Sequence, residues 1–308
     1  MKKLLSAVSL AAVSAAGASA QDGRFEFVSD NSIGIDDPFA VEDLSGDPTL
    51  AGFDLEAAFD SNNLARWVQP LEGRAVLRFE QQVRGRFYLD RDDLNSLLLT
   101  PRVQFWNTTS DNRFQFRAYA AYSHMTRDGD TRWTRPEGEM QLRRRHDEER
   151  RNETVLRLRA NAYDFEEGVV GAGLDQTRVR AGVEHFIRPT PGVNELRLSG
   201  FYEVADADLE RNSFEEVRVA AVYRHKISPC DTLQIRLDLR DREYDGAFSA
   251  AFPVNRSDER FTAEVRVERQ IAERAIGYAS VGHIENSSNV PVRDYGGATF
   301  KLGVRAQF

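Results

Sequence analysis

The chain ends with residues 299–308, TFKLGVRAQF, in which apolar side chains alternate with polar or small ones. The apolar positions are Phe300, Leu302, Val304, Ala306 and Phe308. Alternation with a period of two residues predicts a β-strand that has one apolar face and one polar face. A soluble domain usually ends in a few frayed polar residues. Because this pattern continues to the last residue, we expect the strand to be paired and its apolar face to be covered.

The same alternation recurs throughout the second half of the sequence. In one example, Leu233, Ile235 and Leu237 alternate with polar or charged residues. Eight such segments are expected to be strands, at 153–166, 174–188, 194–205, 214–226, 232–245, 258–272, 275–285 and 295–308. A soluble β-sandwich also has half-exposed strands, but it connects its sheets by Greek keys around one core. Uniform, consecutive strands instead favour an up-and-down β-barrel.

The links between these segments alternate in length. Short links at 188–192, 228–231 and 272–274 separate longer links at 205–213, 245–258 and 285–294. Bacterial outer-membrane barrels have short periplasmic turns and longer external loops, and their strands are long enough to cross a bilayer when tilted. The sequence therefore predicts an all-β transmembrane antiparallel barrel in the outer membrane of a Gram-negative bacterium.

The strand count is less certain in the first half of the chain. Segments 50–60, 74–90, 94–106 and 113–127 are expected to be strands, whereas 128–152 is either a connection or holds one more strand around 139–149. A single-chain barrel normally has an even number of strands. About fourteen strands are expected, with a further strand in 60–90, and twelve is the alternative.

Residues 1–20 have the pattern of a secretory signal peptide, with a basic start, an apolar middle and an Ala18-Ser19-Ala20 cleavage site. Residues 21–49 carry eight acidic side chains against Arg24 alone. We expect this segment to be a flexible acidic periplasmic leader. The barrel is then expected to cover 50–308.

Composition agrees with an exported barrel. Nothing after residue 20 approaches the ~20 apolar residues of a membrane-spanning helix. The single cysteine, Cys230, cannot form an internal disulfide. Five scattered histidines show no zinc-type spacing, and no G-x-S-x-G motif is present. We therefore expect that the protein is not an enzyme, holds no metal or cofactor and binds no nucleic acid.

Many charged side chains fall on the polar face of the expected strands. They are Arg157, Arg159, Arg178, Arg180, Glu184, Arg197, Glu216, Arg218, Arg236, Asp238, Arg240, Glu264, Arg266, Glu268 and Arg305. A charge facing lipid costs about 2–4 kcal/mol at mid-membrane, so this face is expected to line the lumen. Two interpretations stay open: a ladder of ion pairs that fills and stiffens the lumen, or a water-filled pore whose arginine rows attract anionic solutes or polymers.

Three short segments carry a resemblance. FDLEAAFDSNNLA (53–65), LRDREYDG (239–246) and HIENSSNVPVRDYGGATFKLGVRAQF (283–308) resemble the opening strand, an upward strand and the final hairpin of the barrel in surface lipoprotein assembly modifiers and related repeat-associated barrels. The resemblance implies a 14-stranded barrel that helps cargo across the outer membrane. Those proteins usually carry a helical repeat domain before the barrel, and only 21–49 precedes it here.

The last strand also resembles the signal by which outer-membrane proteins are recognised for insertion. In that interpretation Phe300, Leu302, Val304, Ala306 and Phe308 form the C-terminal assembly signal, and the insertion machinery is a partner together with outer-membrane lipids. The expected function is a channel, or a translocation or assembly factor for surface-exported cargo with a periplasmic partner. The alternatives are a small general or oligosaccharide-type porin, and a structural or surface-interaction barrel with a closed lumen.

Overall fold

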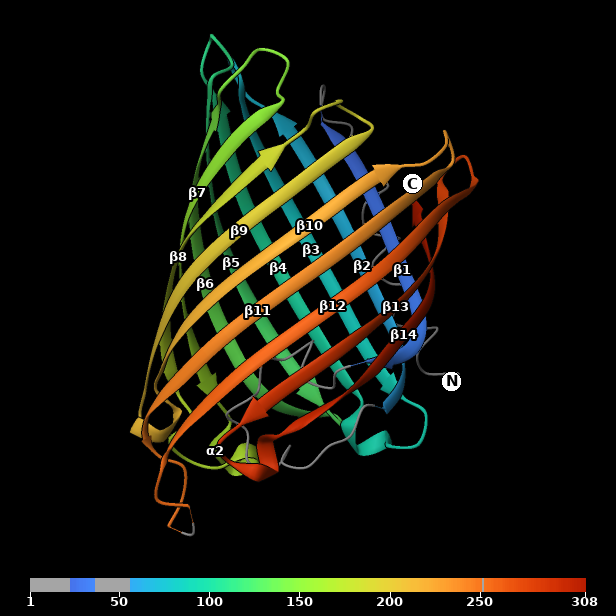
Figure 1. The fold of residues 1–308 in the computed structure, drawn as a ribbon. Coiled ribbons are helices and arrows are strands. Elements are labelled where there is room, and N and C mark those ends of the chain that lie inside the picture. Colours follow the sequence, from blue (N-terminus) through green and yellow to red (C-terminus); the bar gives the residue numbers. More distant parts are fainter. Residues whose placement is uncertain (1–22, 37–55, 251) are drawn as a thin grey trace.

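The computed structural model describes residues 23–36, 56–250 and 252–308, which form a closed antiparallel β-barrel of fourteen strands (Figure 1). The strands are β1 (Arg24–Asp36), β2 (Glu56–Pro70), β3 (Ala75–Tyr88), β4 (Ser96–Thr108), β5 (Phe114–Arg127), β6 (Asp130–Arg145), β7 (Asn152–Phe165), β8 (Gln176–Ile187), β9 (Asn194–Ala207), β10 (Phe214–Lys226), β11 (Asp231–Ala247), β12 (Asn255–Ala272), β13 (Ala275–Ser288) and β14 (Tyr295–Gln307).

Each strand pairs with its neighbours in the sequence, and β1 pairs with β14 to close the sheet. Ile33 lies opposite Leu302, and Ile35 lies opposite Phe300. Closure pairs every strand on both sides, so no sheet edge faces lipid. The predicted fold class and the expected fourteen strands are confirmed.

The predicted flexible leader is wrong for residues 24–36, because they form β1. The barrel therefore begins at Arg24, ahead of the predicted start at residue 50. Glu26 accepts a hydrogen bond from Arg66 at 3.0 Å, and Asp30 accepts one from Arg305 at 3.0 Å. The acidic residues that made the segment look disordered thus balance arginines on both neighbouring strands. Residues 1–20 and 37–49 lie outside the described residues, and so does the signal-peptide prediction.

Two further boundaries differ from the sequence prediction. The expected strand 50–60 is, in its described part, the start of β2, which continues to Pro70. The uncertain stretch 128–152 holds β6, which starts directly after a tight turn at Asp128 and Gly129. Both turn residues have positive φ, 50° and 90°, as a two-residue β-hairpin turn requires. The additional strand expected within 60–90 is wrong, since the fourteenth strand is β1.

The outer face of the barrel is apolar along most strands. On β14, Phe300 and Leu302 are 50% and 53% exposed, and the alternate residues Lys301 and Arg305 point inward. Leu156, Val217 and Leu239 are similarly exposed on other strands. An apolar outer face around a charged interior is the arrangement that a lipid bilayer requires of a β-barrel.

Connections divide the barrel into two ends. The end that carries the links 71–74, 109–113, 146–151, 188–193, 227–230 and 273–274 is called the turn side here, and the opposite end the loop side. The loop side carries short helices: η3 (Asp92–Leu94), α2 (Glu167–Val170), η4 (Glu210–Asn212) and η5 (Pro291–Arg293). Within the described residues, no helix is long and apolar enough to cross a membrane.

Candidate functional site: an arginine-lined lumen

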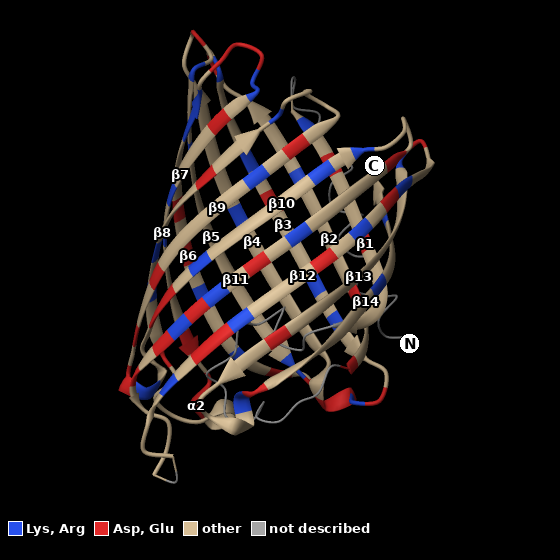
Figure 2. Cartoon of the chain, viewed as in Figure 1, with Lys and Arg blue, Asp and Glu red and all other residues tan. Residues whose placement is uncertain are grey.

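Charged residues recur along the strands, with uncharged residues between them (Figure 2). The inward-facing members form ion pairs from strand to strand around the barrel. Arg157 on β7 shows the pattern: its guanidinium donates to Glu139 on β6 at 2.9 Å and to Glu184 on β8 at 3.1 Å. One arginine thus links three consecutive strands. Such cross-strand pairs replace the hydration that each charge loses inside the barrel.

A second group of ion pairs centres on two almost fully buried glutamates. Glu203 on β9 lies 3.6 Å from Arg159 and 3.7 Å from Arg178. Glu216 on β10 lies 3.5 Å from Arg240 and also pairs with Arg242, which is only 2% exposed. Each of these glutamates pairs with more than one arginine, so arginines outnumber carboxylates in this group of ion pairs.

The remaining predicted lumen residues also lie on the inner face. Arg218 and Arg236 share Asp238, at 2.7 and 3.1 Å. Arg266 lies 3.4 Å from Glu264. Arg305 lies 3.4 Å from Glu268, which also pairs with Arg224.

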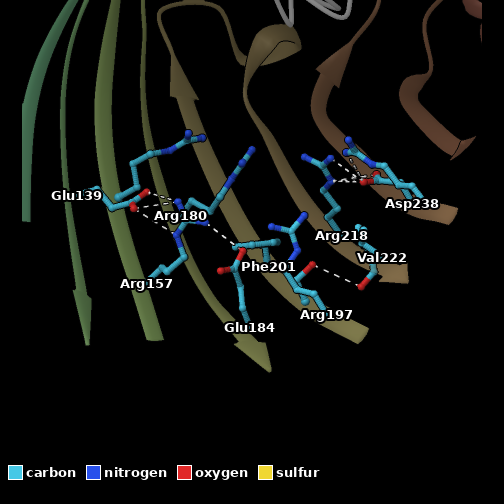
Figure 3. A pocket seen from close by; sticks show the side chains of 13 residues that line it. Glu139, Arg157, Arg180, Glu184, Arg197, Phe201, Arg218, Val222 and Asp238 are labelled. Carbon is cyan, nitrogen blue, oxygen red and sulfur yellow. Dashed lines mark hydrogen bonds and ion pairs between the residues drawn. The ribbon is translucent and has the colours of Figure 1, made fainter. Parts of the chain in front are cut away.

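The inner face of β6 to β11 borders a cavity of about 240 Å³. Its charged lining consists of six arginines and three acids: Arg157, Arg159, Arg180, Arg197, Arg218, Arg236, Glu139, Glu184 and Asp238. Figure 3 shows most of these side chains, which come from consecutive strands of the barrel wall. The lining is therefore strongly cationic, although the whole chain has a net charge of −8.

Arg197 on β9 differs from the other arginines of this cavity. Its side chain forms no hydrogen bond or ion pair with any described residue, and it is only partly buried. The register explains this, because Phe186 on β8 and Val222 on β10 lie directly opposite Arg197 on the inner face. No carboxylate stands at either cross-strand position. The guanidinium of Arg197 is thus available to a solute, with its donors uncommitted.

The two ends of the lumen differ. On the loop side, inward-facing aromatic and aliphatic side chains pack into a mouth cluster, made up of Ala58, Tyr88, Leu94, Leu98, Met125, Trp133, Tyr163, Phe165, Val170 and Leu174. Val170 belongs to α2 and Leu174 to the link that follows, so this connection packs inward. On the turn side, a second cavity of about 360 Å³ is bordered by Arg188, Arg224 and Lys226. The loop-side end of the lumen therefore holds an apolar cluster, whereas the turn side holds a second cavity with charged residues in its lining.

The structure brings the predicted charges together on one face of the wall, where several of their partners are acids that the sequence analysis did not name. Glu139 and Glu203 were not among the candidates, although each accepts from arginines that were. Glu139 lies in the stretch whose strand was uncertain. The Asp128-Gly129 dipeptide could have fixed that strand and its inward positions. Among the described residues, no group of three or more histidine, cysteine or acidic side chains is placed to hold a metal ion.

Comparisons with solved structures find other outer-membrane barrels. DcaP, an outer membrane channel of Acinetobacter baumannii, superposes with a TM-score of 0.54 at 13% identity, covering 95% of this chain and 100% of that one. OmpT of Vibrio cholerae gives 0.52 at 12% identity, over 94% and 99% of the two chains. CdiB from A. baumannii gives 0.52 at 12% identity, over 94% of this chain and 60% of its own. The fold is that of a bacterial outer-membrane β-barrel.

No protein-family model matches the sequence, and no curated protein matches it. The resemblance to surface lipoprotein assembly modifiers therefore has no support beyond the short segments quoted above. At such low identity the structural likeness establishes the fold and, with the apolar outer face, the outer-membrane location.

Proposed function

We propose that this protein is an outer-membrane channel that conducts small anionic solutes. The observation that carries the proposal is Arg197, a lumen arginine with no partner in the described chain, beside a cavity lined by six arginines and three acids. An excess of fixed positive charge in a narrow, low-dielectric passage raises the local concentration of anions. One of the structural neighbours, DcaP, is described as an outer membrane channel, which agrees with this function.

The paired arginines and Arg197 have different roles in this proposal. Paired arginines such as Arg157 and Arg218 keep the wall rigid and set the positive field. Arg197 offers a planar, permanently charged fork that binds carboxylate or phosphate oxygens. A single uncommitted arginine binds an anion weakly enough for release, as conduction requires.

A translocation or assembly role for surface-exported cargo is the second candidate. The turn-side cavity, bordered by Arg188, Arg224 and Lys226, favours it, because a periplasmic partner would meet that end of the barrel first. This function predicts a complex with a periplasmic protein, which site-specific cross-linking at the turns would detect. A channel conducts without any partner, so conductance of the isolated barrel separates the two functions.

The direct test measures uptake of a labelled sugar acid and its neutral parent sugar into liposomes that contain the folded barrel. The wild type should pass the anion faster than the neutral sugar. Arg197→Gln should lower the anion rate by about three- to tenfold and leave the neutral rate nearly unchanged. Arg144→Gln is the matched control, because Arg144 is exposed on β6 outside the lumen and its loss changes the net charge equally.

If Arg197→Gln and Arg144→Gln slow anion uptake equally, Arg197 has no special role in selectivity. If the wild type passes the neutral sugar faster than the anion, the proposed anion channel is wrong.

A further inference from the structure

Four polar residues interrupt the apolar outer face on β1 and β2. Ser29 and Asn31 on β1 and Ser61 and Asn63 on β2 form what we call the polar patch. On β1, Ser29 and Asn31 alternate in step with Ile33, which is 46% exposed on the outer face. Their cross-strand partners on β2 point to the same face. Ser29 lies opposite Asn63 and Asn31 opposite Ser61, so the four side chains form two adjacent rungs. The patch therefore lies on the face that elsewhere contacts lipid tails.

The patch lies near mid-height in the membrane. Its residues are at the centres of β1 (Arg24–Asp36) and β2 (Glu56–Pro70). Outward-facing apolar residues flank it along β1 on both sides, with Phe25 toward the turn side and Ile33 toward the loop side. Headgroups and water are thus too far away to satisfy these side chains.

Hydrogen bonds within the patch use only part of its capacity. Asn31 Nδ2 donates to Ser29 Oγ at 2.9 Å, Ser29 Oγ donates to Asn63 Oδ1 at 2.8 Å, and Asn63 Nδ2 donates to Ser61 Oγ at 3.0 Å. Among the described residues nothing accepts from the Ser61 hydroxyl or donates to Asn31 Oδ1. One N–H of each asparagine also stays uncommitted.

Unsatisfied amide and hydroxyl groups are costly in hydrocarbon, where no water can replace the missing partner. A protein partner within the membrane removes that cost. The uncommitted groups include both donors and an acceptor, so the patch is complementary to itself. Small residues stand directly beside two of its members: Gly85 lies opposite Ser61, and Ala306 lies opposite Ser29. Small residues with polar hydrogen bonds are typical of contacts between membrane segments.

We propose that the polar patch is the contact between two copies of this chain in the outer membrane. A two-fold axis through the patch places Asn31 of each copy against Asn63 of the other, so that each amide gains a donor and an acceptor. The patch is uncharged, which makes a second identical surface a better match than a charged partner. This inference does not depend on the lumen or on the solute.

The test uses the mature barrel folded in lipid nanodiscs or mild detergent, with its mass measured by native mass spectrometry. The wild type should be mainly dimeric. Asn31→Leu/Asn63→Leu should lower the dimer association constant by at least about tenfold. Tyr223→Leu is the matched control, because it removes an outward hydroxyl, bonded to Asn194, on β10 at the opposite side of the barrel. That variant should stay dimeric.

Thermal unfolding of the monomer separates this proposal from a purely internal role for the network. A contact surface predicts that Asn31→Leu/Asn63→Leu raises the unfolding temperature of the lipid-embedded monomer, since apolar side chains suit hydrocarbon. An internal strut between β1 and β2 predicts a lower unfolding temperature and no change in mass. That result, or a wild type that is monomeric in nanodiscs, would overturn the proposal.

Discussion

At the scale of single residues, stability depends on which arginines have carboxylate partners. Arg242 and Glu216 are the most enclosed pair: both side chains are at most 2% exposed, and Arg242 Nε donates to Glu216 at 2.9 Å. The guanidinium also stacks on Phe214, with its carbon 4.0 Å from the ring centroid. Removal of one member takes a carboxylate partner from a charge that is almost fully buried.

Glu216→Ala should therefore lower the free energy of unfolding by about 3 kcal/mol. Equilibrium urea unfolding of the barrel in lipid vesicles measures this change. Glu243→Ala is the control, because Glu243 is exposed beside Arg242 on β11, and its loss should change the free energy by less than about 0.5 kcal/mol. Equal effects of the two variants would contradict the assigned role of the buried pair.

The turn between β6 and β7 has a pH-sensitive residue. Backbone N–H groups of Arg151 and Asn152 both donate to the Asp147 carboxylate at 2.7 Å, and the bond from Arg151 is the largest cause of the lowered pKa of Asp147. A lowered pKa in the folded state means that the carboxylate stabilises the turn above its unfolded pKa of about 3.9. That stabilisation is lost as the pH falls through the folded-state pKa of Asp147.

Amide hydrogen exchange should show this loss at the N–H groups of Arg151 and Asn152. Their protection factors should fall between pH 4 and pH 2 in the wild type. Asp147→Asn should give lower, pH-independent protection at the same amides. Protection that is constant to pH 2 in the wild type would show that the carboxylate does not hold the turn.

At the scale of elements, the link that contains α2 narrows the loop-side mouth. Val170 and Leu174 are each only 5% exposed and pack against inward-facing aromatic residues of the mouth cluster, such as Trp133 and Tyr163. Val170→Ser/Leu174→Ser should loosen this packing and raise the single-channel conductance by about twofold or more, since removal of two buried side chains costs several kcal/mol of local packing. Val292→Ser, at an exposed valine of η5, should leave the conductance unchanged.

Some elements could be predicted from the sequence and others could not, for physical reasons. Strands β7–β14 have apolar residues at most of their outer positions, so alternation alone reveals them, although acids such as Glu259 on β12 interrupt it near the loop side. Strand β1 alternates as well, but Ser29 and Asn31 replace apolar residues on its outer face, and its inward acids suggested disorder. Its pairing partners, Arg66 and Arg305, lie far away in the sequence.

The candidate site was predictable only in part. Alternation places Arg197 on the inner face, but its lack of a partner follows from the register, which sets Phe186 and Val222 opposite it. Register depends on turn geometry and on the packing of whole strands. The sequence alone therefore identified the arginine rows but could not single out Arg197.

In the whole molecule, positive and negative side chains are unevenly distributed between the lumen and the rest of the chain. The chain carries 49 acidic and 41 basic residues, and yet the cavity beside Arg197 is lined by twice as many arginines as acids. Among the described residues, other acids lie in the links and on outward positions, such as Asp92, Asp208 and Glu259. This distribution makes the passage cationic in a protein that is anionic overall.

The reversal potential of single channels tests that claim most directly. The folded mature protein is placed in a planar bilayer between unequal concentrations of potassium chloride, and the zero-current voltage is measured. A cationic passage predicts discrete openings whose reversal potential has the sign expected for chloride selectivity. Arg197→Gln should shift this reversal potential toward zero. A reversal potential of the sign set by potassium, or a correctly folded barrel that conducts no ions, would contradict it.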